Sequence, residues 1–371
     1  MKEKICGIIL KVSYPSMGDT SNIELLGKTM LDWVALSFGD SPYCAISYSD
    51  SVSLPLLVRP YVDRDTEFTV VLYSDTPLIT RKTVLDAVCA LEQSSSNVLK
   101  LTRGYVFRTQ FLLSCEKLYT ENHQFFDEED FLTAFSFKQA AMVGDALKNR
   151  ILSYHMERGV QIEDPASTFI GCDVVIGKGV IISPNNTIKG NSIIKDNVRL
   201  KNGNIIDGCI IDEEAQILQS HLISSFIGKK TTVGPFAYIR PKSIIGNGCR
   251  IGDFVEIKKS VVGDGTKIAH HAYVGDAELG KKCNVGCGVV FSNFDGKLKK
   301  KTRVGDNVFI GSNSNLIAPL YINDGAYIAA GSTITQNIPQ DALAIARERQ
   351  VIKPEWAKKK REEQSKQEKN Y

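Results

Sequence analysis

The sequence predicts an N-terminal α/β domain followed by a left-handed parallel β-helix of hexapeptide repeats. Three observations support this fold class. Strands and helices alternate over about the first 160 residues, an aliphatic residue recurs at every sixth position over much of the stretch from Ile170 to Ile334, and a chain of 371 residues is long enough for two domains. We therefore expect an α/β domain at 1–160, the β-helix at 161–350 and a charged tail at 351–371.

The N-terminal region carries two apolar runs of strand length, Ile5–Leu10 and Phe68–Tyr73. Between and after them lie helix-like patterns at Lys28–Phe38, Thr80–Leu91 and Asp130–Met156. Strands that alternate with helices are typical of an α/β domain with a largely parallel sheet.

The six-residue repeat sets the architecture of the rest of the chain. An unbroken first run comprises Ile170, Ile176, Ile182, Ile188, Ile194, Leu200 and Ile206. After a change of phase the repeat resumes at Ile227, Val233, Ile239, Ile245, Ile251 and Ile257, continues in shorter runs at Val262, Ile268, Val274 and at Leu279, Val285, and returns after an interruption at Val304, Ile310, Leu316, Ile322, Ile328 and Ile334. Each unit makes one short strand and one turn, so roughly 18 residues complete a coil and each aliphatic side chain stacks on its counterpart one coil away.

The left-handed winding is a property of hexapeptide repeats and does not follow from the spacing itself. A right-handed β-helix and an ordinary α/β domain with many short strands are the alternatives. The repeat stops between Phe291 and Val304, where Ser292–Arg303 must leave the prism as a loop. Loops on a rigid scaffold often carry function.

Composition excludes several classes of function. The net charge of +3 is too small to indicate nucleic-acid binding, and no apolar stretch approaches the roughly 18 residues of a membrane span. The N-terminus has no signal-peptide pattern. Nine scattered cysteines without zinc-type spacing indicate buried thiols in a reducing cytoplasm. The charge-rich tail after Trp356 is expected to be a solvated, frayed end.

Four segments in the last 200 residues or so are much more specific than the repeat. They are Gly234–Pro241, Phe254–Lys259, His270–Glu278 and Asn293–Gly296, with the sequences GPFAYIRP, FVEIKK, HHAYVGDAE and NFDG. Their order and spacing closely resemble the acetyltransferase half of the bifunctional bacterial family that makes UDP-N-acetylglucosamine. The resemblance implies acetyl transfer from acetyl-CoA to the amine of glucosamine 1-phosphate, in the synthesis of cell-wall precursors.

His270 matches the general base of that family. The reaction needs a base because an ammonium group cannot attack a thioester, and a histidine with a free pKa near ~6.5 suits this task at neutral pH. The other positions that match sugar-phosphate ligands are Arg240, Lys258, Tyr273 and Asn284, with Lys299 on the loop reaching a bound phosphate or a neighbouring chain. Solvated surface charges are the alternative for Arg240 and Lys258, and a structural corner residue is the alternative for Asn284.

The resemblance also implies a site for acetyl-CoA as co-substrate. The matching positions are Cys287, Asn293, Phe294, Ser312, Ala330 and Arg347. Small residues at 312 and 330 let the pantetheine arm lie against the prism, and Arg347 would reach a CoA phosphate. The sequence departs from the family at Phe294, where tyrosine is usual, and at Cys287, where a small residue such as alanine is usual. We expect neither change to abolish activity. The missing hydroxyl at Phe294 removes at most one hydrogen bond, typically ~0.5–1.5 kcal/mol, and Cys287 is expected to make its contact through its backbone.

The N-terminal half resembles the uridyltransferase domain of the same family in a degenerate, shortened form. After Ile8–Leu10 comes KVSYPSMG, which lacks the glycines and the arginine of the family's phosphate-binding loop. Asp75, in the segment LYSDTPL, is a weak candidate for a metal ligand. The sequence therefore predicts that uridyl transfer is lost, with Mg²⁺ needed only if this domain is active, and that the domain preserves the fold, regulates, or covers the open end of the β-helix.

Several alternatives to this function remain at the level of sequence. They are acetylation of a related amino sugar phosphate, a non-catalytic or regulatory subunit that binds a nucleotide sugar, and a zinc-dependent hydratase, for which the five histidines are poorly spread. Prisms of this kind pack around a threefold axis, so the resemblance implies a cytoplasmic homotrimer whose active sites use more than one chain.

Overall fold

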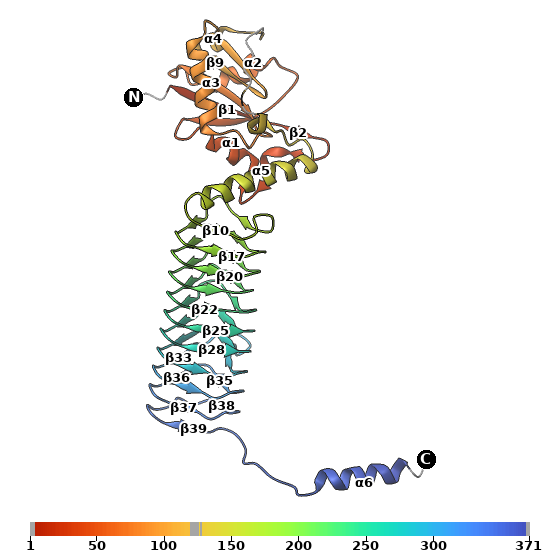
Figure 1. Cartoon of the computed structure of the whole chain (residues 1–371), viewed down its shortest axis with the longest axis vertical. Coiled ribbons are helices and arrows are strands. Elements are labelled where there is room, and N and C mark those ends of the chain that lie inside the picture. Colours follow the sequence, from red (N-terminus) through yellow and green to blue (C-terminus); the bar gives the residue numbers. More distant parts are fainter. Residues whose placement is uncertain (1–3, 119–125, 127, 369–371) are drawn as a thin grey trace. The chain divides into compact units, whose positions relative to one another are not determined.

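The computed structural model describes residues 4–118, 126 and 128–368. The chain divides into two compact units, Met1–Lys242 and Ser243–Tyr371. The first unit contains an α/β region and the first coils of a parallel β-helix, and the second contains further coils and the C-terminal segment (Figure 1).

A five-stranded sheet organises the α/β region. Its strand order is β6 (Tyr43–Ser47), β1 (Ile5–Lys11), β7 (Phe68–Tyr73), β9 (Gly104–Arg108), β8 (Val98–Leu101). Strand β1 pairs in parallel with both β6 and β7, and β9 is the one strand of the sheet that runs in the opposite direction. The predicted largely parallel sheet is therefore confirmed. The β8–β9 hairpin was not predicted, because its two short strands follow one another without a helix between them, and the prediction relied on strands that alternate with helices.

Strand β1 is apolar along its length because both faces of the sheet are covered. Ile5 and Ile9 belong to one core cluster, and Ile8 and Leu10 belong to another. The helices of this region are α1 (Met30–Leu36), α2 (Leu54–Val58), α3 (Arg81–Gln93) and α4 (Thr109–Ser114). Short elements complete it: β2 (Ser13–Tyr14), β3 (Gly18–Asp19), β4 (Glu24–Leu25), β5 (Lys28–Thr29), η1 (Thr20–Asn22), η2 (Arg59–Tyr61) and η3 (Glu128–Phe131).

Helix α5 (Phe137–Met156) joins the α/β region to the first coil. It begins later than the predicted Asp130, because Ser136 caps it by accepting a hydrogen bond from the amide of Gln139. The helix contacts β10 and β11, the first strands of the β-helix, and the Lys148 ammonium donates to the Ala166 carbonyl across 3.3 Å. It therefore covers the N-terminal open end of the prism, which is one of the roles that the sequence left open for this half of the chain.

The first unit contains three parallel faces of the β-helix. One face comprises β10 (Gln161–Ile162), β13 (Ile181–Ile182), β16 (Arg199–Leu200), β19 (Gln216–Ile217) and β22 (Thr232–Val233). The second comprises β11 (Phe169–Ile170), β14 (Thr187–Lys189), β17 (Ile205–Asp207), β20 (His221–Ile223) and β23 (Tyr238–Ile239). The third comprises β12 (Val175–Ile176), β15 (Ile193–Ile194), β18 (Ile210–Ile211) and β21 (Phe226–Ile227).

The second unit repeats the arrangement. One face comprises β25 (Arg250–Asp253), β28 (Lys267–His270), β31 (Asn284–Val285), β34 (Phe309–Ile310), β37 (Tyr327–Ile328) and β39 (Leu343–Ala344). The second comprises β26 (Glu256–Lys258), β29 (Tyr273–Gly275), β32 (Val290–Ser292), β35 (Asn315–Ile317) and β38 (Thr333–Ile334). The third comprises β24 (Ile244–Ile245), β27 (Val261–Val262), β30 (Ala277–Leu279), β33 (Thr302–Val304) and β36 (Leu320–Ile322).

The aliphatic residues of the six-residue repeat form the core of both sets of coils. All of those predicted to stack inward are buried except Ile176, which is only half-buried. Ile176 lies in β12, the first strand of its face, so it has a partner strand on one side only, whereas helix α5 contacts β10 and β11, which begin the other two faces. The periodicity therefore predicted each buried core position of the repeat except Ile176.

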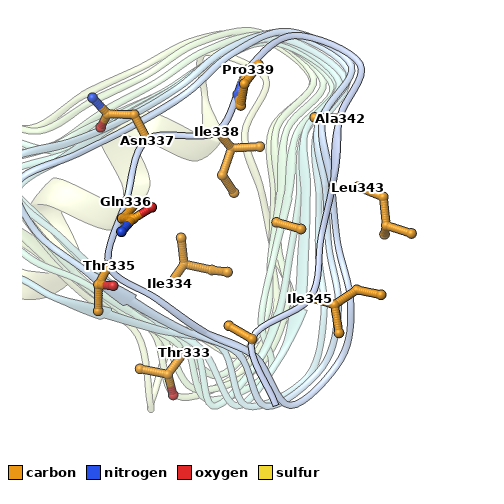
Figure 2. A pocket seen from close by; sticks show the side chains of 12 residues that line it. Thr333, Ile334, Thr335, Gln336, Asn337, Ile338, Pro339, Ala342, Leu343 and Ile345 are labelled. Atoms are coloured by element: carbon orange, nitrogen blue, oxygen red, sulfur yellow. The ribbon is translucent and has the colours of Figure 1, made fainter. Parts of the chain in front are cut away.

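The last coil ends at a cavity of about 280 Å³ lined by residues between Thr333 and Ala346 (Figure 2). Ile334 and Ile338 point into the coil, whereas Leu343 points outward (Figure 2). None of the predicted site residues lines this cavity. Beyond it, the tail forms helix α6 (Trp356–Glu368), exposed where its side chains are described, and not the frayed segment that we expected. Within the described residues, no helix is both long and apolar enough to cross a membrane.

Candidate active site

Successive coils of the second unit stack five of the predicted residues at one corner of the prism. We call this set the corner column: His270, Cys287, Ser312, Ala330 and Arg347. Backbone hydrogen bonds connect its levels: Gly288 donates to the His270 carbonyl (3.3 Å), Asn313 to the Cys287 carbonyl (2.7 Å) and Gly331 to the Ser312 carbonyl (2.8 Å). A Cβ built on Gly331 would lie 4.0 Å from Cδ of Arg347, which places Arg347 at the next level.

His270 stands at the first level of the column. Its Nδ1 lies 2.6 Å from a carboxylate oxygen of Asp253, the residue opposite it in the pairing of β25 with β28. This hydrogen bond holds the pKa of Asp253 below its usual value. The adjacent His271 instead stacks on Phe254, with the ring centroids 4.8 Å apart. The structure thus separates the two histidines: one faces a carboxylate and the other an aromatic ring.

A second group of predicted residues gathers around Asp276. We call it the polar cluster: Lys258, Tyr273, Asp276, Asn293 and Lys299. The Asn293 amide donates to Asp276 (2.6 Å) and lies 3.4 Å from the Tyr273 hydroxyl, and the Lys258 ammonium lies 3.6 Å from the same carboxylate. Lys258 and Asn293 are both buried. One carboxylate therefore orients a lysine and an amide that the sequence assigned to different substrates.

Gly275 makes this arrangement possible. A Cβ at this position would lie 2.6 Å from Cζ of Tyr273 and 2.7 Å from Nδ2 of Asn293, closer than real Cβ contacts allow. The φ angle of Gly275 is not in the left-handed region, so the requirement is for space and not for backbone freedom. Glycine at 275 thus leaves space for the Tyr273 ring and the Asn293 amide beside strand β29.

The loop that interrupts the repeat forms a small hairpin. Asn293 and Lys300 pair through their backbones, and Asp295 accepts hydrogen bonds from the amides of Lys297 and Leu298. Lys299 is exposed on this hairpin, and the neighbouring Lys258 ammonium lowers its pKa below the usual value for lysine. Two cations close enough to repel one another are an arrangement that a bound dianion would stabilise. Phe294 is exposed on the same hairpin.

Three predicted ligands lie outside both groups: Phe294 on the hairpin, Asn284 and Arg240. Asn284 lies on β31, flanked by Lys267 and Phe309 on the neighbouring strands, and so on a different face of the prism from Tyr273. Arg240 belongs to the first unit, directly after β23, where its guanidinium lies 5.7 Å from the centroid of the Tyr238 ring.

Asp75, the weak candidate for a metal ligand, is fully buried at the carboxyl end of β7. Both of its oxygens accept hydrogen bonds from Arg103 (3.1 and 2.7 Å), and the Tyr14 hydroxyl donates to it across 2.5 Å. Burial and this hydrogen bond raise the pKa of Tyr14 to about 12. Arg103 also lies over the Tyr73 ring, 4.2 Å from its centroid. An arginine thus holds the carboxylate that Mg²⁺ would need, so these residues do not fit a metal, and no metal-type cluster of His, Cys, Asp or Glu occurs among the described residues.

The sequence did not single out three residues that organise the site: Asp253, Asp276 and Gly275. Asp276 and Gly275 lie in one of the segments that carry the family resemblance, but no role had been assigned to them. Asp253 precedes His270 by one coil, so the roughly 18-residue period could have placed it beside the histidine. The expectation of buried thiols holds for five of the nine cysteines, whereas Cys89 and Cys287 are exposed.

Comparison with known proteins supports the repeat and the family resemblance. The family model "Bacterial transferase hexapeptide (six repeats)" matches residues 301–336, and the model "GMPPB C-terminal domain" matches residues 221–310. The predicted left-handed β-helix of hexapeptide repeats is thereby confirmed.

Curated relatives share a long region with this chain. The bifunctional protein GlmU of Acetivibrio thermocellus is 53% identical over 222 residues, which are 60% of this chain and 48% of that protein. The bifunctional protein GlmU of Clostridium beijerinckii is 51% identical over 223 residues, 60% of this chain and 49% of that protein. The predicted resemblance to the bifunctional family is confirmed, and the chain spans about half the length of the curated relatives it matches.

Among solved structures, LpxA, a UDP-N-acetylglucosamine acyltransferase from Bacteroides fragilis, is 22% identical with a TM-score of 0.36. The match covers 49% of this chain and 70% of that one. The functional argument therefore rests on the curated relatives and on the geometry of the site.

Proposed function

We propose that this chain, similar to the bifunctional GlmU proteins over 60% of its length, transfers acetyl from acetyl-CoA to the amine of glucosamine 1-phosphate. The product is N-acetylglucosamine 1-phosphate, a precursor of UDP-N-acetylglucosamine. The corner column carries the proposal, because it aligns the candidate base with the residues assigned to acetyl-CoA on consecutive coils.

The column suits a long thioester substrate. Ser312 and Ala330 are small, so the pantetheine arm can lie along the corner, with Arg347 near its phosphates and His270 at the other end. The backbone carbonyl of Cys287 already accepts a hydrogen bond from the Asn313 amide. The exposed side chain of Cys287 is therefore the part proposed to contact the arm. His270 takes the proton from the sugar amine as the amine attacks the thioester carbon.

The polar cluster is the proposed site of the sugar phosphate. Lys258 and Lys299 supply positive charge, and Tyr273 offers a hydroxyl to the sugar. Asn293 and Phe294 lie where the hairpin leaves the prism, so the same loop would contact the acetyl donor. Arg240 and Asn284 are proposed as further ligands of the sugar phosphate, on the resemblance alone.

The N-terminal α/β region is proposed to have lost uridyl transfer. Ligands of doubly wound sheets bind at the carboxyl ends of the strands where the strand order reverses, here the ends of β1 and β7. Arg103, Asp75 and Tyr14 occupy this edge with a bonded network of their own. The role proposed for region 1–160 is to cover the first coil of the β-helix domain 161–350 through α5, with 351–371 as a tail.

The proposed assembly is a homotrimer that acts in the cytoplasm. Acetyl-CoA is a cytoplasmic substrate, and all nine cysteines are free thiols. Asn284 lies on another face of the prism than Tyr273, so a second chain is the natural source of the missing ligand in each site.

The test measures thiol release from acetyl-CoA with glucosamine 1-phosphate, for the native chain and for His270→Ala. We expect acetyl transfer that falls by ~10² to 10⁴ in the variant, and no uridyl transfer from UTP in a parallel assay. A well-folded oligomer that acetylates no glucosamine 1-phosphate contradicts the proposal. A related amino sugar phosphate or a regulatory role would then be the better hypothesis.

A further inference from the structure

Asp253 forms a hydrogen bond with the ring of the proposed base, and the family resemblance assigns it no role. We propose that Asp253 is a positioning residue for His270: its carboxylate accepts a hydrogen bond from Nδ1–H, which leaves the lone pair on Nε2, and it stabilises the imidazolium formed during acetyl transfer. This inference rests on the proposed function and extends it to the residue that orients the base.

The geometry of the two strands supports the pairing. Asp253 ends β25 and His270 ends β28, and the two residues are direct partners in the parallel register. The His271 amide donates to the Asp253 carbonyl across 3.0 Å, which fixes the two backbones at this level. Because both side chains start from a rigid ladder, the 2.6 Å contact between Nδ1 and the carboxylate needs little additional ordering.

The surroundings leave Asp253 as the one charged partner of the ring among the described contacts. Lys267 begins the strand that His270 ends, and His271, directly after it, stacks on Phe254. Strand β31, on the other side, consists of Asn284 and Val285, and neither is titratable. Cys287, at the next level of the corner column, carries an exposed thiol, which is titratable. The His270 side chain is 52% exposed, so Nε2 can be reached by a substrate.

The proton balance requires such a partner. The amine nitrogen attacks the thioester carbon, the C–N bond forms and the C–S bond breaks. The amine proton goes to Nε2 of His270 and then to the departing thiolate of CoA, so the base is regenerated. An ionised carboxylate at Nδ1 favours the positive ring between these two transfers, and the hydrogen bond from His270 keeps the pKa of Asp253 low enough for that charge.

A purely structural role predicts something different. Asp253 and His270 are both partly exposed, and ion pairs at such positions contribute little to folding stability. The isosteric variant Asp253→Asn should therefore keep the oligomer and its thermal unfolding midpoint. An effect confined to catalysis then identifies positioning of the base.

The kinetic test compares Asp253→Asn and Asp253→Glu with a matched control, Asp264→Asn. Asp264 lies in the same unit and accepts a hydrogen bond from the Asn247 amide, which an asparagine oxygen can also accept. We expect kcat to fall about 10- to 100-fold in Asp253→Asn with the KM for both substrates nearly unchanged. Asp253→Glu, which retains the charge, should recover part of the loss, and Asp264→Asn should behave as the native chain.

The pH profile of kcat/KM tests the direction in which Asp253 affects His270. A nearby anion stabilises the charged imidazolium, so its removal makes His270 a weaker base, and the acid limb of kcat/KM should move to lower pH in Asp253→Asn. A kcat and a pH profile identical to those of the native chain in Asp253→Asn would overturn the proposal. So would a loss that lies entirely in KM.

A second readout does not depend on acetyl transfer. Diethyl pyrocarbonate modifies neutral imidazole, and fragmentation mass spectrometry separates His270 from His271, so the rate of modification at His270 reports how the carboxylate affects the ring. We expect this rate, compared at one mildly acidic pH, to be higher in Asp253→Asn, because the anion that favours the charged ring is gone. If the native chain shows no acetyl transfer but this rate still changes, the proposed function fails while the pairing stands. An unchanged rate refutes the pairing itself.

Discussion

At the scale of single residues, charge and space determine what the candidate site can do. Lys258 and Lys299 concentrate positive charge beside Asp276, and Gly275 leaves room for the Tyr273 ring. Cys287 adds an exposed thiol to the corner column. Two predictions follow from the lysines and from the thiol.

Binding of the sugar phosphate should weaken at alkaline pH. The pKa of Lys299 is lowered by Lys258, so Lys299 loses its proton at a lower pH than an ordinary lysine, and the phosphate then loses one of its cations. The KM for glucosamine 1-phosphate should therefore rise as pH increases through that lowered pKa. Steady-state kinetics across the alkaline range measure this effect.

Variants of the hairpin lysines separate this effect from a general loss of activity. Lys299→Arg stays charged and should remove the alkaline rise, whereas Lys299→Met should raise the KM about tenfold at neutral pH. Lys297→Met, on the same hairpin, is the control and should leave the KM unchanged. A KM in Lys299→Met equal to the native value would show that this lysine does not contact the phosphate.

Alkylation of Cys287 should inactivate the protein. The thiol is exposed at the corner proposed for the pantetheine arm, so N-ethylmaleimide on its sulfur would block that arm. We expect acetyl-CoA to protect against inactivation, and Cys287→Ala to remain active and become resistant. Mass spectrometry should find the exposed Cys89 labelled at the same rate with and without acetyl-CoA, and equal labelling of Cys287 under both conditions would place acetyl-CoA elsewhere.

At the scale of elements, the same type of strand end has two different roles in this chain. The ends of β25 and β28 present Asp253 and His270 to solvent, whereas the end of β7 buries Asp75 beneath Arg103. The first arrangement leaves a nitrogen free for chemistry. The second satisfies both carboxylate oxygens internally, so this edge of the α/β sheet stabilises the fold instead of binding a metal.

Removal of Arg103 should therefore destabilise the α/β region. Arg103→Met leaves a buried carboxylate without its cation, and the expected loss is about 3 kcal/mol, at the low end for such pairs because a third of the Arg103 side chain is exposed. Adding Asp75→Asn should recover part of it. Denaturant unfolding of the single and double variants measures both effects, and an undiminished stability in Arg103→Met would show that Asp75 does not depend on this arginine.

At the scale of the whole molecule, the first coil is covered by α5, whereas the last coil ends at the open cavity in Figure 2. The ligands assigned to one sugar phosphate lie on two different faces of the prism. In the proposed homotrimer, the face of one copy would meet the cluster of another and so complete the site.

Complementation tests this assembly. A mixture of His270→Ala and Asn284→Ala chains, dissociated and reassembled together, should regain acetyl transfer if His270 and Asn284 of one site come from different chains. Each variant reassembled alone is the control and should stay nearly inactive. No recovery in a mixture that forms mixed oligomers, as measured by mass spectrometry, would place both residues of a site in a single chain.

The sequence alone determined the β-helix and its core. Each short strand of every coil needs an aliphatic residue at its inward position, so the aliphatic residues recur with a six-residue period. It also determined the strands β1 and β7, which are buried on both faces and therefore continuously apolar. The family resemblance supplied the candidate base and most ligands, but not the residues that organise them.

The contacts at the site were decided by the tertiary structure. Asp253 precedes His270 by 17 residues, and the levels of the corner column are separated by 17 residues between 270 and 287, 25 between 287 and 312, 18 between 312 and 330, and 17 between 330 and 347. Because coils differ in length wherever a turn or the hairpin intervenes, the period can place Asp253 on the coil next to His270 but cannot fix the contact between their side chains. The pairing of Asp253 with His270, and of Arg103 with Asp75, depends on strand register and on side-chain packing that no local pattern encodes.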